Sequence, residues 1–379
     1  MKIAVIRQKY VNYGGAEHFV SDYASHMADA GHEVHIFANQ WTPSACPNIH
    51  QHKVSSIKLN AFTRCLSFAW FAARAVKGFD IVQSHERTFH QDIYRAGDGC
   101  HKEWLEQRKK YLSPLKRFFL EWNLFHQLIL RLERGLFEGG CLKIIAISEM
   151  VKKDILRHYR ASEESIAVVY NGVSLTKFHP DNRERYRKSI RDSLGIEEGT
   201  VMVLFVGSGF ERKGLRFLIR SLKHWREKNW KLVLMGRGDY KSYTAEACAE
   251  DRQKIICLDP VDDIQKYYAA ADIFVLPSIY EPFGNANLEA LASGLSCVVS
   301  GRSGASEIVT HKDNAMRLTN PDDPEEIADH INHLFALPVR EAMGVRARKL
   351  AESFTPERNV REMENIYLQV QAMKQGVSL

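Results

Sequence analysis

The feature that most constrains the fold is a unit that recurs along the chain: a short apolar run, a turn that contains glycine, and a helical stretch. The first unit joins the run IAVI to a helix that ends near Gly31 and to a second run, EVHIFAN. Glycine just beyond the last helical residue is a common helix stop. The series continues with FDIVQSH, KIIAIS and IAVVYNGV. Apolar strands that alternate with helices predict a parallel sheet with crossover helices.

The pattern starts again after a charged connector, KFHPDNRERYRKSIRDSLGI. Five more apolar runs follow, each with a turn and helical residues after it: TVMVLFVGSG, WKLVLMGRGD, KIICLDPV, ADIFVLPS and LSCVVSG. A chain of 379 residues also exceeds the usual size of a single hydrophobic core. We therefore predict two doubly wound α/β domains that meet near Asn171 and Gly172. Because ligands of such folds lie beyond the carboxyl ends of the strands, the expected site is an interdomain cleft.

Composition indicates a cytosolic protein with an anionic partner. The seven cysteines are odd in number, scattered and never spaced C-x-x-C, which is typical of a reducing compartment. The start MKIAVIRQKY predicts a strand rather than a secretory signal, and no window approaches the roughly 18 apolar residues of a membrane span. Residues 1–170 hold 23 Lys and Arg against 17 Asp and Glu, whereas residues 171–379 hold 29 of each. This local excess favours a phosphorylated substrate or an anionic membrane surface over nucleic acid.

Two glycines and two cations follow the first strand of the second domain, in the sequence VGSGFERKG. Gly207 and Gly209 allow a sharp turn, and Arg212 and Lys213 come directly after it. Adjacent cations at a strand end suit a diphosphate. Arg-Lys pairs are also common on solvated surfaces, so this stretch alone leaves both interpretations open.

A second stretch, EPFGNANLE, holds two carboxylates eight residues apart, Glu281 and Glu289. Four residues between them stand where a helix is expected to begin: Gly284, Asn285, Ala286 and Asn287. Backbone amides and the helix dipole at such a position favour an anion. A glycosidase pair is a poor fit, because helical rise would separate the two acids by roughly 12 Å. We favour carboxylates that bind sugar hydroxyls, one on a ribose and one on a hexose.

With these motifs the chain resembles the retaining glycosyltransferases of family 4, which have the GT-B fold, and among them the lipopolysaccharide core glucosyltransferases that act on heptose. The resemblance covers nearly the whole chain. It rests on the diglycine after the first strand, VYNGV, GSGFERKG, AAADIFVLPSIYEPFGNANLEALASG and VVSGRSGASEIV. It implies two Rossmann-like domains that face a cleft. Residues 1–171, completed by a helix at about 357–379, would bind the acceptor, and residues 172–356 would bind the nucleotide sugar.

The resemblance also implies a role for each matching position. Glu289 would bind the ribose hydroxyls of the nucleotide, and Glu281 would contact the transferred sugar. Arg212 and Lys213 would bind the diphosphate and stabilise the leaving group. The remaining donor-binding positions are Gly14, Gly15, Gly207, Arg237, Pro260 and Val261, together with the four residues at the helix start.

Asp98, in DIYRAGDGC, matches an acidic position that the heptose-directed members carry in the N-terminal domain. We favour Asp98 as the catalytic group of this domain. Many other members place a histidine in this region, so His101 is the alternative. Asp98 between two glycines also fits an ordinary turn residue.

The implied reaction forms a glycosidic bond with retention of the anomeric configuration. No enzyme nucleophile stands out, so our hypothesis is a front-face substitution assisted by the departing phosphate. Neither the aspartates nor the sixteen histidines show a convincing metal-ligand spacing, and we expect neither a metal nor a cofactor. The nucleotide sugar is a substrate.

The stretch from residue 101 to 134 carries eight Lys and Arg against four Glu, interleaved with aromatic residues. Such a composition suits a helix at an anionic membrane interface. It also suits an ordinary helix pair whose aromatic face is buried, and both interpretations stay open. The related lipopolysaccharide enzymes use this region for membrane association, which implies a cytoplasmic protein peripheral to the inner membrane.

The predicted activity is the transfer of a hexose, with UDP-glucose as the first candidate donor, to a lipopolysaccharide core or related glycolipid. A mannosyl- or N-acetylhexosaminyl-transferase of O-antigen or capsule assembly would share every donor-side motif and is the alternative. A sugar-nucleotide-binding protein without turnover would leave Asp98 without a role. A phosphorylase of similar fold would need a pyridoxal phosphate lysine motif, which we do not find.

Overall fold

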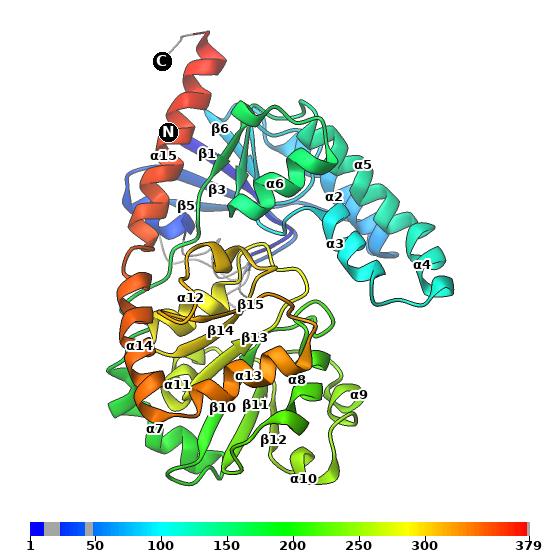
Figure 1. The fold of residues 1–379 in the computed structure, drawn as a ribbon. Helices are drawn as coiled ribbons and strands as arrows, with labels where there is room; N and C mark the ends of the chain where they lie inside the picture. Colours follow the sequence, from blue (N-terminus) through cyan, green and yellow to red (C-terminus); the bar gives the residue numbers. More distant parts are fainter. Residues whose placement is uncertain (11–22, 42–47, 377–379) are drawn as a thin grey trace. The chain divides into compact units, whose positions relative to one another are not determined.

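The computed structural model describes residues 1–10, 23–41 and 48–376, and its chain divides into two compact units (Figure 1). Unit 1 comprises Met1–Asn171 and Pro356–Leu379, and unit 2 comprises Gly172–Thr355. Each unit is built on one main parallel sheet with helices between its strands. The predicted doubly wound α/β fold is therefore confirmed for both units.

The main sheet of unit 1 has seven parallel strands in the order β5-β3-β1-β6-β7-β8-β9. These strands are β1 (Lys2–Ile6), β3 (Glu33–Ala38), β5 (Ile49–Lys53), β6 (Ile81–Ser84), β7 (Ile93–Ala96), β8 (Lys143–Ala146) and β9 (Ile166–Val168). The order runs outward from β1 on both sides, which places the topological switch point between β1 and β6. A separate parallel ladder pairs β2 (Lys9–Tyr10) with β4 (Gln40–Trp41).

Helices cover both faces of this sheet. On one face, α15 (Pro356–Gln375) and the helical residues 23–29 share a core with β1 and β3. On the other face, α2 (Ala61–Ala75) packs its buried Phe68 and Ala72 against the strands. The helix after β8 is α6 (Glu149–His158), which is followed by a 3₁₀ turn, η1 (Glu163–Ser165). The last helix of the chain thus belongs to the N-terminal unit.

Residues 101–137 form three helices rather than one helix or a pair. They are α3 (His101–Lys109), α4 (Pro114–Glu121) and α5 (Leu124–Phe137). Pro114 starts α4 and Asn123 caps α5 through its side chain, so the two breaks follow ordinary helix-start chemistry. The helix α5 buries Ile129, Leu132 and Leu136, whereas α4 buries only Leu120. Among the described residues, no helix is both long and apolar enough to cross a membrane.

The sheet of unit 2 has six parallel strands in the order β12-β11-β10-β13-β14-β15, one strand more than the five predicted. These are β10 (Val201–Val206), β11 (Trp230–Met235), β12 (Ile255–Leu258), β13 (Ile273–Leu276), β14 (Ser296–Ser300) and β15 (Met316–Leu318). The switch point lies between β10 and β13. All residues of β13 and β14 are buried, as expected for a parallel sheet covered on both faces.

Ten helical elements accompany this sheet in the described chain. They are α7 (Asn182–Ser193), α8 (Leu215–Ser221), η2 (Leu222–His224), α9 (Tyr240–Thr244), α10 (Ala249–Arg252), α11 (Ile264–Ala270), α12 (Asn285–Ala292), η3 (Gly304–Glu307), α13 (Pro324–Leu334) and α14 (Leu337–Ala351).

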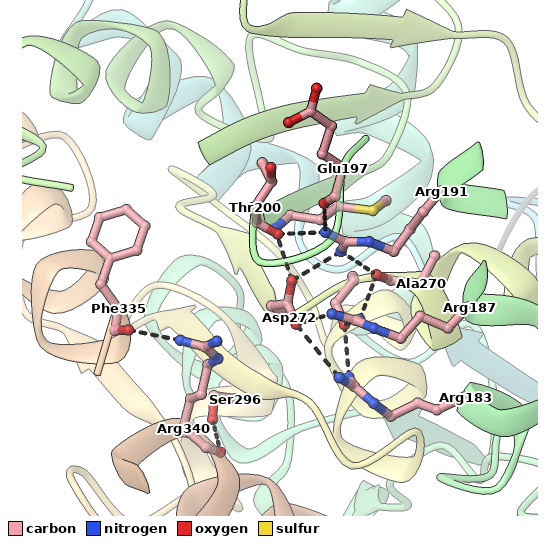
Figure 2. Close-up of polar contacts among 12 residues, drawn as sticks. Arg183, Arg187, Arg191, Glu197, Thr200, Ala270, Asp272, Ser296, Phe335 and Arg340 are labelled. Atoms are coloured by element: carbon pink, nitrogen blue, oxygen red, sulfur yellow. Dashed lines mark hydrogen bonds and ion pairs between the residues drawn. The ribbon is translucent and has the colours of Figure 1, made fainter. Parts of the chain in front are cut away.

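Three arginines of α7 converge on one buried carboxylate, Asp272, at the start of β13 (Figure 2). Arg183, Arg187 and Arg191 are spaced by four residues, so they share one helix face. Arg187 donates to Asp272 at 2.7 Å, and Arg187 and Arg191 also donate to the carbonyl of Ala270 at the end of α11. The charged connector predicted from the sequence is therefore part of unit 2 and packs against its β13 and α11.

Candidate functional site

The loop after β10 is a tight turn built on glycine. Gly207 and Gly209 have φ angles of 150° and 75°, which other residues rarely adopt. A Cβ on Gly207 would lie 3.1 Å from Cε of Lys213, so the lysine side chain runs along the glycine backbone. A Cβ on Gly236, after β11, would lie 2.3 Å from the Gly207 carbonyl oxygen. Only glycine allows these two loops to come so close.

Three charged side chains meet where the loop after β10 contacts the loop after β13. Lys213 Nζ donates to Glu281 Oε2, and Arg212 Nη1 lies 3.1 Å from the same oxygen. Arg212 Nη1 also donates to the Tyr280 carbonyl at 3.3 Å, and Ile279 N donates to the Arg212 carbonyl at 2.9 Å. The two loops flank the switch point of the sheet, which is where open α/β sheets bind ligands.

This cluster is buried and keeps a net positive charge. Glu281 and Lys213 are 6% and 8% exposed, and the Arg212 side chain is 33% exposed. Burial acts to raise the pKa of Glu281, but the charges of Arg212 and Lys213 outweigh it and hold that pKa below its usual value. Burial lowers the pKa of Lys213 despite the neighbouring carboxylate. Two cations against one carboxylate suit an anionic ligand.

The loop after β14 fixes the backbone around Glu281. Glu281 N donates to the Arg302 carbonyl at 3.0 Å, and Gly304 N donates to the Glu281 carbonyl at 3.0 Å. Ser303 Oγ donates to the Phe283 carbonyl at 2.8 Å. The position of the Glu281 carboxylate therefore depends on three loops, which follow β10, β13 and β14.

The helix α12 begins at Asn285, and Gly284 stands at its N-cap with a φ of 90°. A Cβ on Gly284 would lie 2.6 Å from Asn287 Nδ2 and 3.0 Å from Glu281 Cγ. No side chain of the described residues caps this helix. Asn287 is fully buried, and both polar atoms of its amide lack a hydrogen-bond partner within the described chain. Buried amides without partners are rare, so the start of α12 has unused hydrogen-bonding capacity beside the ion cluster.

Glu289 lies one turn further along α12 and is half-buried. The Tyr268 hydroxyl, from α11, donates to Glu289 Oε2 at 2.9 Å and lies 3.3 Å from the Ala286 carbonyl. Burial raises the pKa of Tyr268 well above its usual value, so the hydroxyl remains a donor. Glu281 thus pairs with Arg212 and Lys213, whereas Glu289 accepts a hydrogen bond from Tyr268.

The other candidate donor residues of unit 2 lie further along the sheet edge. Arg237 N donates to Ser208 Oγ at 2.9 Å, which joins the loop after β11 to the loop after β10, and the Arg237 side chain is exposed. Pro260 and Val261 follow β12 and are exposed. The contacts within the described chain do not connect Pro260 or Val261 to the Glu281 cluster.

A second charged cluster lies at the carboxyl ends of β1 and β6 in unit 1. Arg7 Nη1 lies 3.6 Å from Glu86 Oε1 and 4.0 Å from Asp98 Oδ2, and Arg87 Nη1 lies 4.0 Å from the same Asp98 oxygen. The Asp98 side chain is 48% exposed, whereas those of both arginines are buried. Sequence reasoning did not single out Arg7, Glu86 or Arg87. The sequence could have indicated them, because these charged residues directly follow two predicted strands, in the runs IAVI and FDIVQSH.

His101 begins α3 and is engaged by neighbouring side chains. Its Nε2 lies 3.0 Å from His126 Nδ1, and its backbone N donates to Glu133 Oε1 at 2.8 Å. Burial lowers the pKa of His101 to about 3, with contributions from Arg87 and His126. The ring is therefore neutral near pH 7, whereas Asp98 offers an accessible carboxylate. Gly14 and Gly15, the other candidate residues of this unit, lie outside the described residues.

Two family models match the chain. The model described as Glycosyltransferase Family 4 matches residues 13–177, and the model described as Glycosyl transferases group 1 matches residues 200–336. The chain belongs to glycosyltransferase family 4. The family predicted from the sequence motifs is confirmed, and the protein is a glycosyltransferase.

Relatives of this family 4 enzyme match it along nearly its full length. An uncharacterised glycosyltransferase of Methanocaldococcus jannaschii is 26% identical over 97% of this chain and 98% of its own. The lipopolysaccharide glucosyltransferase WaaG of Escherichia coli is 25% identical over 93% of this chain and 95% of its own.

Solved structures confirm the GT-B fold of the enzyme. A crystal structure of WaaG, a glycosyltransferase involved in lipopolysaccharide biosynthesis, has a TM-score of 0.81 at 22% identity and covers 96% of this chain and 99% of its own. Anabaena HepE in complex with UDP and glucose has a TM-score of 0.75 at 18% identity and covers 97% of this chain and 100% of its own.

Proposed function

We propose that this family 4 glycosyltransferase transfers a hexose from a nucleoside diphosphate sugar to a lipopolysaccharide core heptose, with UDP-glucose as the first candidate donor. The observation that carries the proposal is the meeting of Arg212, Lys213 and Glu281 beside the start of α12. The name of WaaG as a lipopolysaccharide glucosyltransferase and the HepE complex with UDP-glucose support this choice of donor and acceptor.

The two cations would bind the diphosphate. As the bond between the sugar C1 and the phosphate oxygen breaks, negative charge develops on the departing β-phosphate, and Arg212 and Lys213 stabilise it. Glu281 holds both cations in place before the donor binds, so little reorganisation is needed. The acceptor oxygen bonds to C1 on the face that the phosphate leaves, and its proton passes to the phosphate. This front-face substitution retains the anomeric configuration, and the two cations supply the charge that a divalent metal would otherwise supply.

The two carboxylates would bind the sugars on either side of the diphosphate. Both ion pairs of Glu281 use Oε2, and no ion pair of Oε1 occurs within the described chain. Oε1 can therefore accept a hydrogen bond from a hydroxyl of the transferred hexose. Glu289, oriented by Tyr268, would accept hydrogen bonds from the ribose hydroxyls. The start of α12 lies between the two carboxylates and would donate backbone amides to the phosphates.

Asp98 would act from unit 1, with Gly14 and Gly15 close to the donor phosphate. Arg7 and Arg87 flank the Asp98 carboxylate, each at 4.0 Å from Oδ2. A half-exposed carboxylate suits contact with hydroxyls of the acceptor or the transferred sugar. The alternative acceptors, those of O-antigen or capsule assembly, would use the same donor residues of unit 2.

We also propose that α4 contacts an anionic membrane surface. Large apolar side chains are exposed on and just after this helix: Leu115, Phe118, Phe119, Trp122 and Leu124. Lys116 and Arg117 lie among them. A pocket of about 280 Å³ opens beside this patch, and Arg108, Lys116 and Phe119 contribute to its lining. Aromatic and basic side chains together favour the interface of an anionic bilayer, which would place the enzyme at the cytoplasmic face of the inner membrane.

A donor panel tests the proposed reaction. UDP-glucose, UDP-N-acetylglucosamine, GDP-mannose and ADP-glucose are compared by thermal shift, because a ligand at 100 times its Kd stabilises the folded state by about 2.7 kcal/mol. The donor that shifts the midpoint is then incubated with purified lipopolysaccharide cores. The anomeric proton of the product, observed by NMR, should show the α configuration of the donor. A β product, or no response to any of the four donors, would contradict the proposal.

A further inference from the structure

A cluster of three histidines and one glutamate lies on a single face of the edge strand β5 and its neighbour β3. Glu33 and His35 alternate along β3, and His50 and His52 alternate along β5. The two strands are parallel, with His35 opposite His50 and Phe37 opposite His52. Side chains two residues apart on a strand point to the same side, so the pairing brings all four groups together.

The distances within this cluster are short. His35 Nε2 lies 2.7 Å from Glu33 Oε1, and His50 Nε2 lies 3.9 Å from the same oxygen. The ligand atoms of Glu33, His35 and His50 all lie within 4.8 Å of one another. In a tetrahedral zinc site with bonds of about 2.0–2.1 Å, ligand atoms stand roughly 3.3 Å apart. Small rotations of these side chains would therefore place all three atoms around one ion.

We propose that Glu33, His35 and His50 form a Zn²⁺ site, with His52 orienting the ring of His35. Two imidazole nitrogens and one carboxylate oxygen form a ligand set that zinc accepts, with water at a fourth position. Zinc-bound histidines usually donate their second ring N–H to a neighbouring acceptor. Here His35 Nδ1 lies 2.7 Å from His52 Nε2, which is a suitable acceptor.

The surroundings hold the rings in this arrangement. His52 stacks on Phe37 with a centroid distance of 4.7 Å, and Phe79 packs edge-on against His35 at 4.9 Å. His35 itself is buried. Lys2, whose side chain is exposed, pairs with Glu33: its Nζ lies 3.8 Å from Glu33 Oε1. A metal ion would compete with this weak, solvated ion pair.

The location indicates a structural role for the ion. Glu33 stands at the start of β3, and His50 stands near the start of β5. The candidate catalytic residues of unit 1 are at the other end of the strands, where Arg7 and Glu86 follow the carboxyl ends of β1 and β6. The strand β5 is the outermost strand of its sheet, and His50 and His52 make it polar. An ion shared by β3 and β5 would stabilise this edge strand against separation, because metal bound only by the folded state adds to its stability.

The test is the binding of Zn²⁺ to the full-length protein after removal of metals with a chelator. Isothermal titration and elemental analysis should give one ion per chain, and Zn²⁺ should raise the unfolding midpoint. The variants His50→Ala and Glu33→Gln change side chains that are 47% and 49% exposed, so both are expected to fold. Because each variant removes one ligand, each should weaken Zn²⁺ binding at least about tenfold and abolish the rise in the unfolding midpoint.

Matched controls separate this site from other zinc ligands. Glu103, Glu106 and His158 form the other candidate set of the described chain, although Arg157 already pairs with Glu103. Glu106→Gln, in that set, and His90→Ala, an exposed histidine elsewhere in unit 1, should leave Zn²⁺ binding unchanged. The proposal would be overturned if His50→Ala bound Zn²⁺ as tightly as the unaltered protein, or if the unaltered protein bound none.

Discussion

Lys213 donates a hydrogen bond to the buried carboxylate of Glu281 across 68 residues of sequence. This contact joins the loop after β10 to the loop after β13 at the switch point of unit 2. Because both groups are almost fully removed from water, Lys213 depends on this carboxylate for its pairing, and Glu281 depends on Lys213 together with Arg212. The pair therefore serves both the stability of the unit and the proposed donor site.

Loss of the lysine alone should be destabilising. Lys213→Met leaves the Glu281 charge buried with only Arg212 beside it, and we expect unfolding to become easier by about 3–5 kcal/mol. Urea denaturation measures this change. The double variant Lys213→Met with Glu281→Gln should recover most of the loss, because no uncompensated charge remains. Equal stability of the single and double variants would argue against a coupled pair.

The hydroxyl of Tyr268 should matter for donor affinity rather than for the chemical step. Tyr268→Phe removes the hydrogen bond that orients Glu289, at a cost of about 1 kcal/mol or roughly fivefold in affinity. We expect a higher KM for the nucleotide sugar with little change in kcat. A matched control is Tyr243→Phe, on α9, which should leave both constants unchanged. A fall in kcat at constant KM would assign Tyr268 a different role.

Two variants decide between the candidate groups of unit 1. Asp98→Asn should lower kcat by about 10²-fold, because the amide replaces the carboxylate that would hold a hydroxyl of the acceptor or the transferred sugar in the reacting geometry. His101→Asn should have a much smaller effect, because burial keeps that ring neutral and His126 contacts it. Steady-state kinetics with saturating donor measures both. The opposite order of effects would assign the catalytic role to His101.

The exposed aromatic patch on α4 should control membrane binding. Phe118→Ser removes apolar area worth about 2 kcal/mol, so partition onto vesicles with anionic phospholipids should fall roughly 30-fold. Sedimentation with vesicles measures the bound fraction. Val345→Ser, on α14, removes an apolar side chain of unit 2 that is 73% exposed, against 54% for Phe118, and should leave partition unchanged. Equal vesicle binding by the unaltered protein, Phe118→Ser and Val345→Ser would contradict a membrane-facing α4.

The strand–helix alternation was sufficient to predict both sheets, because buried parallel strands are continuous apolar runs. The strands that escaped prediction lack such runs. In β5 (IHQHK) the polar residues outnumber the apolar ones, and β7 contains the buried Arg95, which donates to Asn171. Within the stretch 101–134, Pro114 starts α4, a break that we did not predict, and the sequence alone did not reveal which apolar faces are buried.

For the candidate site, the sequence revealed local motifs but not the contacts between residues that are distant in the chain. Residue chemistry alone favoured sugar-binding carboxylates in EPFGNANLE, but it left ERKG open between a diphosphate site and a solvated surface, and only the family resemblance implied the diphosphate. That both cations bind Glu281, and that Tyr268 binds Glu289, depends on the order of strands in the sheet. The same limit applies to the cluster on β3 and β5. Its two pairs of ligand residues form a set only through the register of parallel strands.

The rate of sugar transfer by Arg212→Ala tests the central claim most directly. Arg212 is one-third exposed, and its removal leaves the pair of Lys213 and Glu281 in place, so the variant should fold. With UDP-glucose and a lipopolysaccharide core acceptor, we predict that kcat falls about 10²-fold or more while the unfolding midpoint stays close to that of the unaltered enzyme. An unchanged kcat would contradict the assignment of this cluster to the departing diphosphate.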